Sequence, residues 1–135
     1  MISILGPNWT NQLIALVQSA ESEIMVTAPY FTKHGVSLLT SNKKPYVSLK
    51  VLIGCSLEDF LNRVSDYGSL VDLVTVSDVH HVFGIDAKIY VVDGERAVIT
   101  FSNLTERGIE TNLEIGVLIE DKEATKDILA FMKPY

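Results

Sequence analysis

Hydrophobic residues recur along this chain in two periods, one typical of helices and one typical of strands. Over residues 8–20, Trp9, Leu13 and Val17 recur at helical spacing after the start signals Pro7 and Asn8, which predicts an amphipathic helix. Two short apolar runs, at residues 23–28 and 47–53, stop at a proline and a glycine and therefore predict strands. A short helix over residues 34–41 is expected between them.

The middle of the chain gives a less regular pattern. Ser56 opens a helical segment, which Asp66 to Gly68 is expected to break. Residues 70–76 suit the end of a helix, a strand or both, and residues 77–84 give no clear pattern. The elements of this region therefore stay open.

Strands cluster in the last third of the chain, and a helix closes it. Strands are expected at residues 85–92, 96–101 and 113–119. The pair Asp93-Gly94 predicts a hairpin turn, which Glu95 could lengthen. Residues 121–132 predict a final helix with Asp121 as its cap.

This order of elements predicts an α/β fold in which a mixed β-sheet is flanked by helices on both faces. The 135 residues suit one domain, residues 1–135, that buries roughly two thirds of the surface of the unfolded chain. We find no internal repeat and no linker rich in Pro, Gly or Ser.

Composition narrows the choice of partners. The formal net charge of −6, with 11 Lys and Arg, opposes non-specific binding to polyanions unless the fold assembles a basic patch. The single Cys55 cannot form an internal disulfide, and no leader-like start is visible, so a cytoplasmic protein is expected. No apolar run approaches the roughly 18 to 20 residues that span a bilayer, so no integral membrane segment is expected.

Candidate chemistry lies in the predicted strand over residues 85–92. Alternation places Asp86, Lys88 and Tyr90 on one face, and Ile85, Ala87, Ile89 and Val91 on the other. Two charged residues inside an apolar strand are costly to bury without partners, which makes them candidates for a site. The alternative is the water-facing side of a half-exposed strand.

A longer pattern surrounds this pair. Lys88, Asp93 and Asn103 fall at the spacings of H-x-K, four residues, D, six residues, G-S-x-N, which is the motif of the phospholipase D superfamily. Gly108, Asn112 and Glu114 fit its downstream element, so the chain resembles a member with one motif, similar to the small endonucleases of the superfamily. Further resembling segments are Ala28-Pro29-Tyr30-Phe31, Leu52-Ile53-Gly54 and residues 116–121.

The resemblance implies a phosphodiesterase scaffold that needs no metal and no cofactor. A histidine of the motif attacks phosphorus, and two motifs meet in one site, so a chain with one motif is expected to be a homodimer. Lys88 and Asn103 would bind the phosphate of a nucleic acid or another phosphodiester. Asp93 would be structural.

This chain departs from the motif at two places. Asp86 stands where the superfamily has its nucleophilic histidine, and a carboxylate repels a phosphodiester. Thr100-Phe101 replaces Gly-Ser, so a bulky ring is expected beside the phosphate. The motif is therefore degenerate, and hydrolysis is expected to be weak or absent.

Glu114 corresponds to the glutamate that orients the histidine, so it would face a carboxylate here. Lys88 could neutralise the pair of acids, the pair could share a proton, or a divalent ion could bind them. We favour neutralisation by Lys88. Any catalysis would involve Asp86, Lys88, Asn103 and Glu114.

Three functions are open at this stage. The first is a dimeric phosphate-binding or scaffolding module with a degenerate motif. The second is a working nuclease or phosphodiesterase that uses Asp86, or a histidine at position 80 or 81, as its attacking group. His34, which is more distant in sequence, is a further candidate for this attacking group. The third function is a structural dimerisation domain without a ligand.

Overall fold

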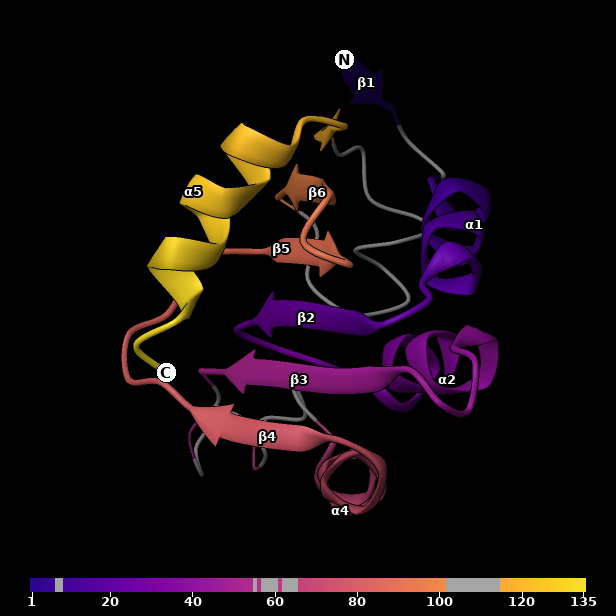
Figure 1. The fold of residues 1–135 in the computed structure, drawn as a ribbon. Coiled ribbons are helices and arrows are strands. Elements are labelled where there is room, and N and C mark those ends of the chain that lie inside the picture. The colour runs from indigo at the N-terminus through magenta and orange to yellow at the C-terminus, as the bar shows by residue number, and fades with distance from the viewer. Residues whose placement is uncertain (7–8, 55, 57–60, 62–65, 102–114) are drawn as a thin grey trace.

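A computed structural model of the chain describes residues 1–6, 9–54, 56, 61, 66–101 and 115–135. The strands of this part form one mixed sheet in the order β1-β7-β6-β5-β2-β3-β4 (Figure 1). They are β1 (Ile2–Leu5), β2 (Glu23–Ala28), β3 (Ser48–Ile53), β4 (Asp78–His81), β5 (Ile89–Val92), β6 (Arg96–Thr100) and β7 (Gly116–Ile119). The helices are α1 (Thr10–Ser19), α2 (Lys33–Asn42), α4 (Tyr67–Val76) and α5 (Lys122–Met132).

Strand direction determines which strands begin and which strands finish at each end of this sheet. Strands β2, β3 and β4 run parallel, while β2–β5, β5–β6, β6–β7 and β7–β1 are antiparallel. Strands β2, β3, β4 and β6 therefore finish at the end where β5 and β7 begin. We call this the site end, and we call the opposite end, which carries the β5–β6 turn, the hairpin end.

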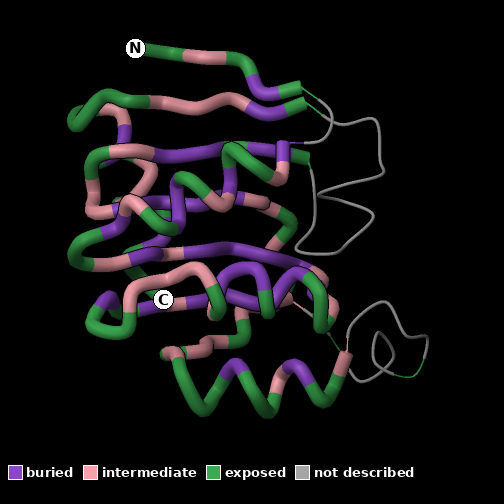
Figure 2. Tube along the Cα trace, turned by 90° about the vertical axis from the view of Figure 1, so that its right-hand side faces the viewer, coloured by how far each residue is buried: buried purple, intermediate pink, exposed green. Residues whose placement is uncertain are grey.

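Helices cover both faces of the sheet, as predicted. Helices α1, α2 and α4 pack on the first face, where Leu13, Leu39 and Leu73 are fully buried. Helix α5 packs on the second face, where Met132 joins Leu52 and Val91 in a smaller cluster. Figure 1 shows α5 on the opposite side of the strands from α1 and α2, and Figure 2 shows buried positions running along the central strands.

Most predicted elements are confirmed with small shifts of their bounds. These are α1, α2, α5, β2, β3, β6 and the described part of the strand expected at 113–119. Asp121 caps α5, since its carboxylate accepts a hydrogen bond from the Ala124 N–H at 2.9 Å. The hairpin turn is also confirmed: Val92 pairs with Arg96, so Glu95 lengthens the turn.

Other expectations were wrong or incomplete. The break expected at residues 66–68 falls at Asp66, which is extended and precedes α4, whereas Gly68 lies inside α4; residues 70–76 are helical. Strands β1 and β4 were not predicted. Regular strand structure begins at Ile89, four residues later than expected. Residues 57–60, 62–65 and 102–114, and with them most of the helical segment opened by Ser56, lie outside the described part.

Candidate functional site

Asp86 and Lys88 lie at the site end, just before β5. The Lys88 ammonium is 3.3 Å from the Asp86 carboxylate and 3.2 Å from the Asp86 carbonyl oxygen. The Lys88 side chain is only 15% exposed, whereas the Asp86 side chain is 91% exposed. The exposed Asp86 carboxylate therefore neutralises the Lys88 ammonium, which is itself largely shielded from water.

The backbone around this pair is held by neighbouring strands. The Thr100 N–H at the end of β6 donates to the Lys88 carbonyl at 3.0 Å. In β2, the buried Thr27 hydroxyl donates to the Ala87 carbonyl at 2.7 Å and accepts from the Ile89 N–H at 3.0 Å. Regular pairing of β5 with β2 begins at Ile89, opposite Thr27, and we call the preceding residues 85–88 the arm.

Gly54, just after β3, lets this arm approach closely. A Cβ atom at Gly54 would lie 2.8 Å from Ile85 Cγ2 and 2.9 Å from the Ile85 carbonyl oxygen. Such distances are too short for any side chain. The glycine is therefore required by the path of the arm.

Alternation along the arm and β5 is confirmed, but the face opposite to Ile89 and Val91 is not polar throughout. Ile85, Ala87, Ile89 and Val91 all join the cluster beneath α5, as expected. Tyr90, however, is buried in the core of the first face, where its ring meets Trp9 edge to face at 5.7 Å. Burial raises the pKa of Tyr90. The expectation that Tyr90 shares a polar, water-facing surface with Asp86 and Lys88 was wrong, because β5 is covered by helices on both faces.

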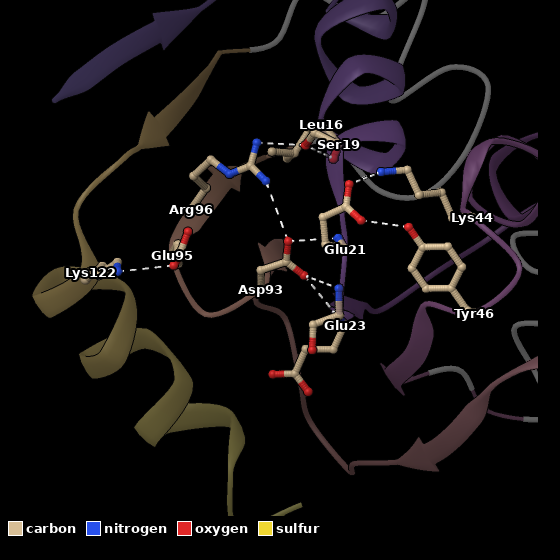
Figure 3. Close-up of polar contacts among 11 residues, drawn as sticks. Leu16, Ser19, Glu21, Glu23, Lys44, Tyr46, Asp93, Glu95, Arg96 and Lys122 are labelled. Atoms are coloured by element: carbon tan, nitrogen blue, oxygen red, sulfur yellow. Dashed lines mark hydrogen bonds and ion pairs between the residues drawn. The ribbon is translucent and has the colours of Figure 1, made fainter.

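Asp93 follows β5 at the hairpin end, so the whole of β5 separates it from Lys88. Figure 3 shows the contacts of Asp93. Its carboxylate accepts hydrogen bonds from the backbone N–H groups of Glu21, Ser22 and Glu23 at 2.8–3.0 Å. Burial raises the pKa of Asp93, but the three amides and the nearby Arg96 lower it by more, so the pKa lies below its ordinary value. These contacts tie the β5–β6 turn to the start of β2.

A second polar group adjoins this tie, and sequence reasoning missed it. Glu21 pairs with the Lys44 ammonium and accepts a hydrogen bond from the Tyr46 hydroxyl at 2.6 Å, as Figure 3 shows. These two hydrogen bonds lower the pKa of Glu21. Arg96 also donates to the Ser19 hydroxyl at 2.7 Å. No local pattern signals contacts between residues so distant in sequence.

The two residues that replace Gly-Ser in the motif differ in environment. Thr100 is buried beside Gly116, where an added Cβ would come within 3.3 Å of the Thr100 Cβ. The Phe101 side chain is 70% exposed. Asn103 and Glu114, expected to complete the site, lie outside the described residues, as does Cys55.

The histidines lie apart from Lys88 in the sheet. His80 and His81 belong to β4, and β2 and β3 separate β4 from β5. The His80 ring nitrogen Nε2 lies 3.0 Å from the Asp78 carboxylate. His34 lies in α2.

A partly open cavity of about 260 Å³ lies on the first face beside α1, away from Asp86 and Lys88. Its lining consists of Leu5, Gln12, Ala15, Leu16, Arg96, Val98, Leu118 and Glu120. In the described ranges, three or more His, Cys, Asp or Glu side chains nowhere gather as they would around a metal ion. None of the described helices combines the length and apolar character needed to cross a membrane.

Comparison with known proteins agrees with the expected fold and family. The chain belongs to the PLD-like family, whose members share the phospholipase D fold. The matching family description is "Cardiolipin synthase, PLD-like domain", and the match covers residues 13–133. No curated protein sequence gives a significant match.

Solved structures of low sequence identity share the fold. The phospholipase D family member Nuc from Salmonella typhimurium is 16% identical with a TM-score of 0.77, over 99% of this chain and 93% of that one. NucT from Helicobacter pylori is 13% identical with a TM-score of 0.74, over 99% and 94%. Phosphatidylserine synthase from Haemophilus influenzae is 18% identical with a TM-score of 0.77, but this chain spans only 36% of its length.

Proposed function

We propose that this chain is a dimeric phospholipase D-like module that binds a phosphodiester and hydrolyses it weakly or not at all. One observation carries the proposal: a carboxylate stands 3.3 Å from the phosphate-binding lysine of the motif, where the family pattern has a nucleophilic histidine. Lys88, with Asn103, would hold the phosphate. A bound phosphodiester would have to compete with Asp86 for the ammonium group.

Chemistry at Asp86 supports loss of turnover more than replacement of the nucleophile. A carboxylate that attacks phosphorus usually needs metal ions or several cations to offset the negative charge of both groups. Lys88 is the cation that contacts Asp86 in the described part of the chain. Direct attack by Asp86 is therefore disfavoured, and strands β2 and β3 separate β5 from β4, which carries the histidines at 80 and 81.

The nature of the ligand and the dimer follow from the motif. One motif supplies half of the residues that the family uses for one site, so two copies would complete it. A nucleic acid is our preferred source of the phosphodiester. One structural neighbour, 15% identical with a TM-score of 0.69, is described as TrmBL2, an archaeal chromatin protein with a novel mode of DNA binding, and this chain spans 51% of its length.

Hydrolysis is tested with bis(p-nitrophenyl) phosphate and with supercoiled DNA, both in the absence of divalent metal. We expect no turnover above that of the Lys88→Ala variant. The Asp86→His variant should gain turnover if the rest of the site is intact. Turnover by the natural chain that Lys88→Ala abolishes would overturn the proposal in favour of a working phosphodiesterase.

Binding is tested by thermal unfolding with a single-stranded oligonucleotide and, separately, with inorganic phosphate. A ligand at 100 times its Kd stabilises the folded chain by about 2.7 kcal/mol, so the Tm should rise with ligand concentration. Lys88→Ala should remove the rise, whereas Lys126→Ala, an exposed lysine on α5, should keep it. A Tm that does not respond to either ligand would favour a purely structural domain.

A further inference from the structure

The cavity beside α1 is a space that the helix and the sheet leave between them on the first face. Its apolar lining comes from Ala15 and Leu16 on α1 and from Leu5, Val98 and Leu118 on three strands. Ala15 carries only a methyl group, so the helix does not fill the space above the strands. A volume of about 260 Å³ is below the roughly 300–1,000 Å³ of pockets for drug-sized ligands, and it therefore suits a smaller molecule.

Two opposite charges line this cavity at the hairpin end of the sheet. In the pairing of β6 with β7, Ala97 lies opposite Ile119, so the next pair is Arg96 with Glu120. Both side chains belong to the lining. Opposite positions on antiparallel strands place Cβ atoms about 4.5–5.5 Å apart. Among the described residues no ion pair joins these two side chains, so each charge can serve a ligand that lies between them.

Arg96 is held in place by the end of α1 and by the β5–β6 turn. Its Nη1 donates to the Ser19 hydroxyl at 2.7 Å, and that hydroxyl donates to the Leu16 carbonyl at 2.6 Å. Its Nη2 lies 3.9 Å from the Asp93 carboxylate, which is too far for a hydrogen bond (Figure 3). A guanidinium has five N–H donors, so Arg96 is fixed in orientation and keeps donors for an anion.

We propose that this cavity binds a small α-amino acid with an aliphatic side chain. The carboxylate of the amino acid pairs with Arg96 and its ammonium group pairs with Glu120. Its side chain lies against the aliphatic residues of the three strands, where burial of apolar surface adds affinity. Gln12 supplies an amide at the edge of the cavity. The site is distinct from Lys88 and stands independently of the proposed function.

The pair of charges selects this ligand over a simple acid or a simple amine. A carboxylic acid that lacks an ammonium group satisfies Arg96 but sets its charge beside the Glu120 carboxylate. An amine that lacks a carboxylate has the reverse conflict with Arg96. Like charges brought together in a partly enclosed site repel each other strongly, whereas a zwitterion meets both groups with the opposite sign.

NMR titration of the 15N-labelled full chain with L-leucine tests the site. The matched ligands are 4-methylpentanoate, which is leucine without its ammonium group, and 3-methylbutylamine, which is leucine without its carboxylate. We expect L-leucine to bind at least tenfold more tightly than either, and the amides of α1, β6 and β7 to shift. Equal affinity of L-leucine and 4-methylpentanoate would overturn the ammonium contact.

The charge of Glu120 is tested by Glu120→Gln, which keeps the size of this exposed side chain. The variant should bind L-leucine at least tenfold more weakly and should bind 4-methylpentanoate no more weakly than the natural chain does. An equal loss of affinity for both ligands would show that Glu120 acts through the structure of the cavity and does not pair with the ammonium group.

The cavity itself is tested by Ala15→Leu, which fills the space between α1 and the strands. This variant should lose L-leucine binding, whereas Ala130→Leu on α5 is the matched control and should keep it. Both alanines are exposed in helices, so circular dichroism should show that both variants stay folded. Binding that survives Ala15→Leu, or a natural chain that does not respond to millimolar L-leucine, would overturn the proposal.

Discussion

The substitution Asp93→Asn tests whether charge at the hairpin end holds the β5–β6 turn against β2. Asp93 has φ 56°, in the left-handed region that asparagine tolerates, so the backbone should keep its conformation. The change removes the negative charge and turns one oxygen into an NH₂ group. In the place of Oδ2 that group would face the Glu21 N–H, with which it cannot form a hydrogen bond, while the remaining oxygen can still accept from the N–H groups of Ser22 and Glu23.

The expected loss of stability follows from these contacts. Hydrogen bonds to a charged group contribute about 1.5–3 kcal/mol each, and an asparagine carbonyl can still accept part of them. We therefore expect the free energy of unfolding at pH 7 to fall by about 2–3 kcal/mol. For a chain of this length the Tm should fall by roughly 6–9 °C.

The pH dependence has a definite sign. Because the pKa of Asp93 is lowered in the folded chain, its contribution is complete above the unfolded pKa and is lost as the pH falls through the lowered folded pKa. The difference between the natural chain and Asp93→Asn should therefore be largest near neutral pH and shrink in acid. Urea unfolding at a series of pH values from neutral to strongly acidic measures it.

Glu95→Gln is the matched control, since it makes the same chemical change in the same turn. Glu95 is half-exposed and pairs at 3.2 Å with an exposed lysine, Lys122, so its loss should cost less than about 1 kcal/mol. If Asp93→Asn costs no more than Glu95→Gln, or if its cost is the same in acid and at neutral pH, the charge of Asp93 does not hold the turn.

Two further predictions concern the arm that carries Lys88. Thr27→Val keeps the shape of the side chain but leaves the Ala87 carbonyl and the Ile89 N–H without their buried hydroxyl partner. The free energy of unfolding should therefore fall by about 2–4 kcal/mol, which urea unfolding measures. An unchanged unfolding midpoint would contradict a hydroxyl that bridges these two backbone groups. Gly54→Ala places a Cβ against the backbone of Ile85. We therefore expect the free energy of unfolding to fall by about 1–3 kcal/mol and amide hydrogen exchange in the arm to become faster. Exchange rates like those of the natural chain would contradict a close approach of the arm to Gly54.

Local signals in the sequence were sufficient for most elements on the two faces. Helix α5 shows why, because its cap and its inner face are encoded within a dozen residues. Strand β4 shows the limit: its sequence Asp-Val-His-His has little strand character, and the strand exists because its backbone pairs with β3. The alternation of Ile2 and Ile4 was a usable signal for β1, whose partner β7 lies near the other end of the chain.

The candidate site, too, was predictable from the sequence only in part. Alternation together with the resemblance to the motif selected Asp86 and Lys88, and the structure brings their side chains together. The shape of the arm was not predictable, because it depends on the Thr27 hydroxyl in β2 and on Gly54, a residue without a side chain just after β3. The same holds at the hairpin end, where the partners of Asp93 lie about seventy residues away in sequence.

The pairing of β1 with β7 has a consequence for synthesis of the chain. Ile2 pairs with Ile119, so β1 has no partner in the sheet until synthesis has passed residue 119. At about 5–20 residues per second, the ribosome needs roughly 6–25 s to go from one strand to the other. During that time an uncharged strand with two isoleucines stays unpaired, and protection of β1 from other nascent chains becomes a requirement for correct assembly.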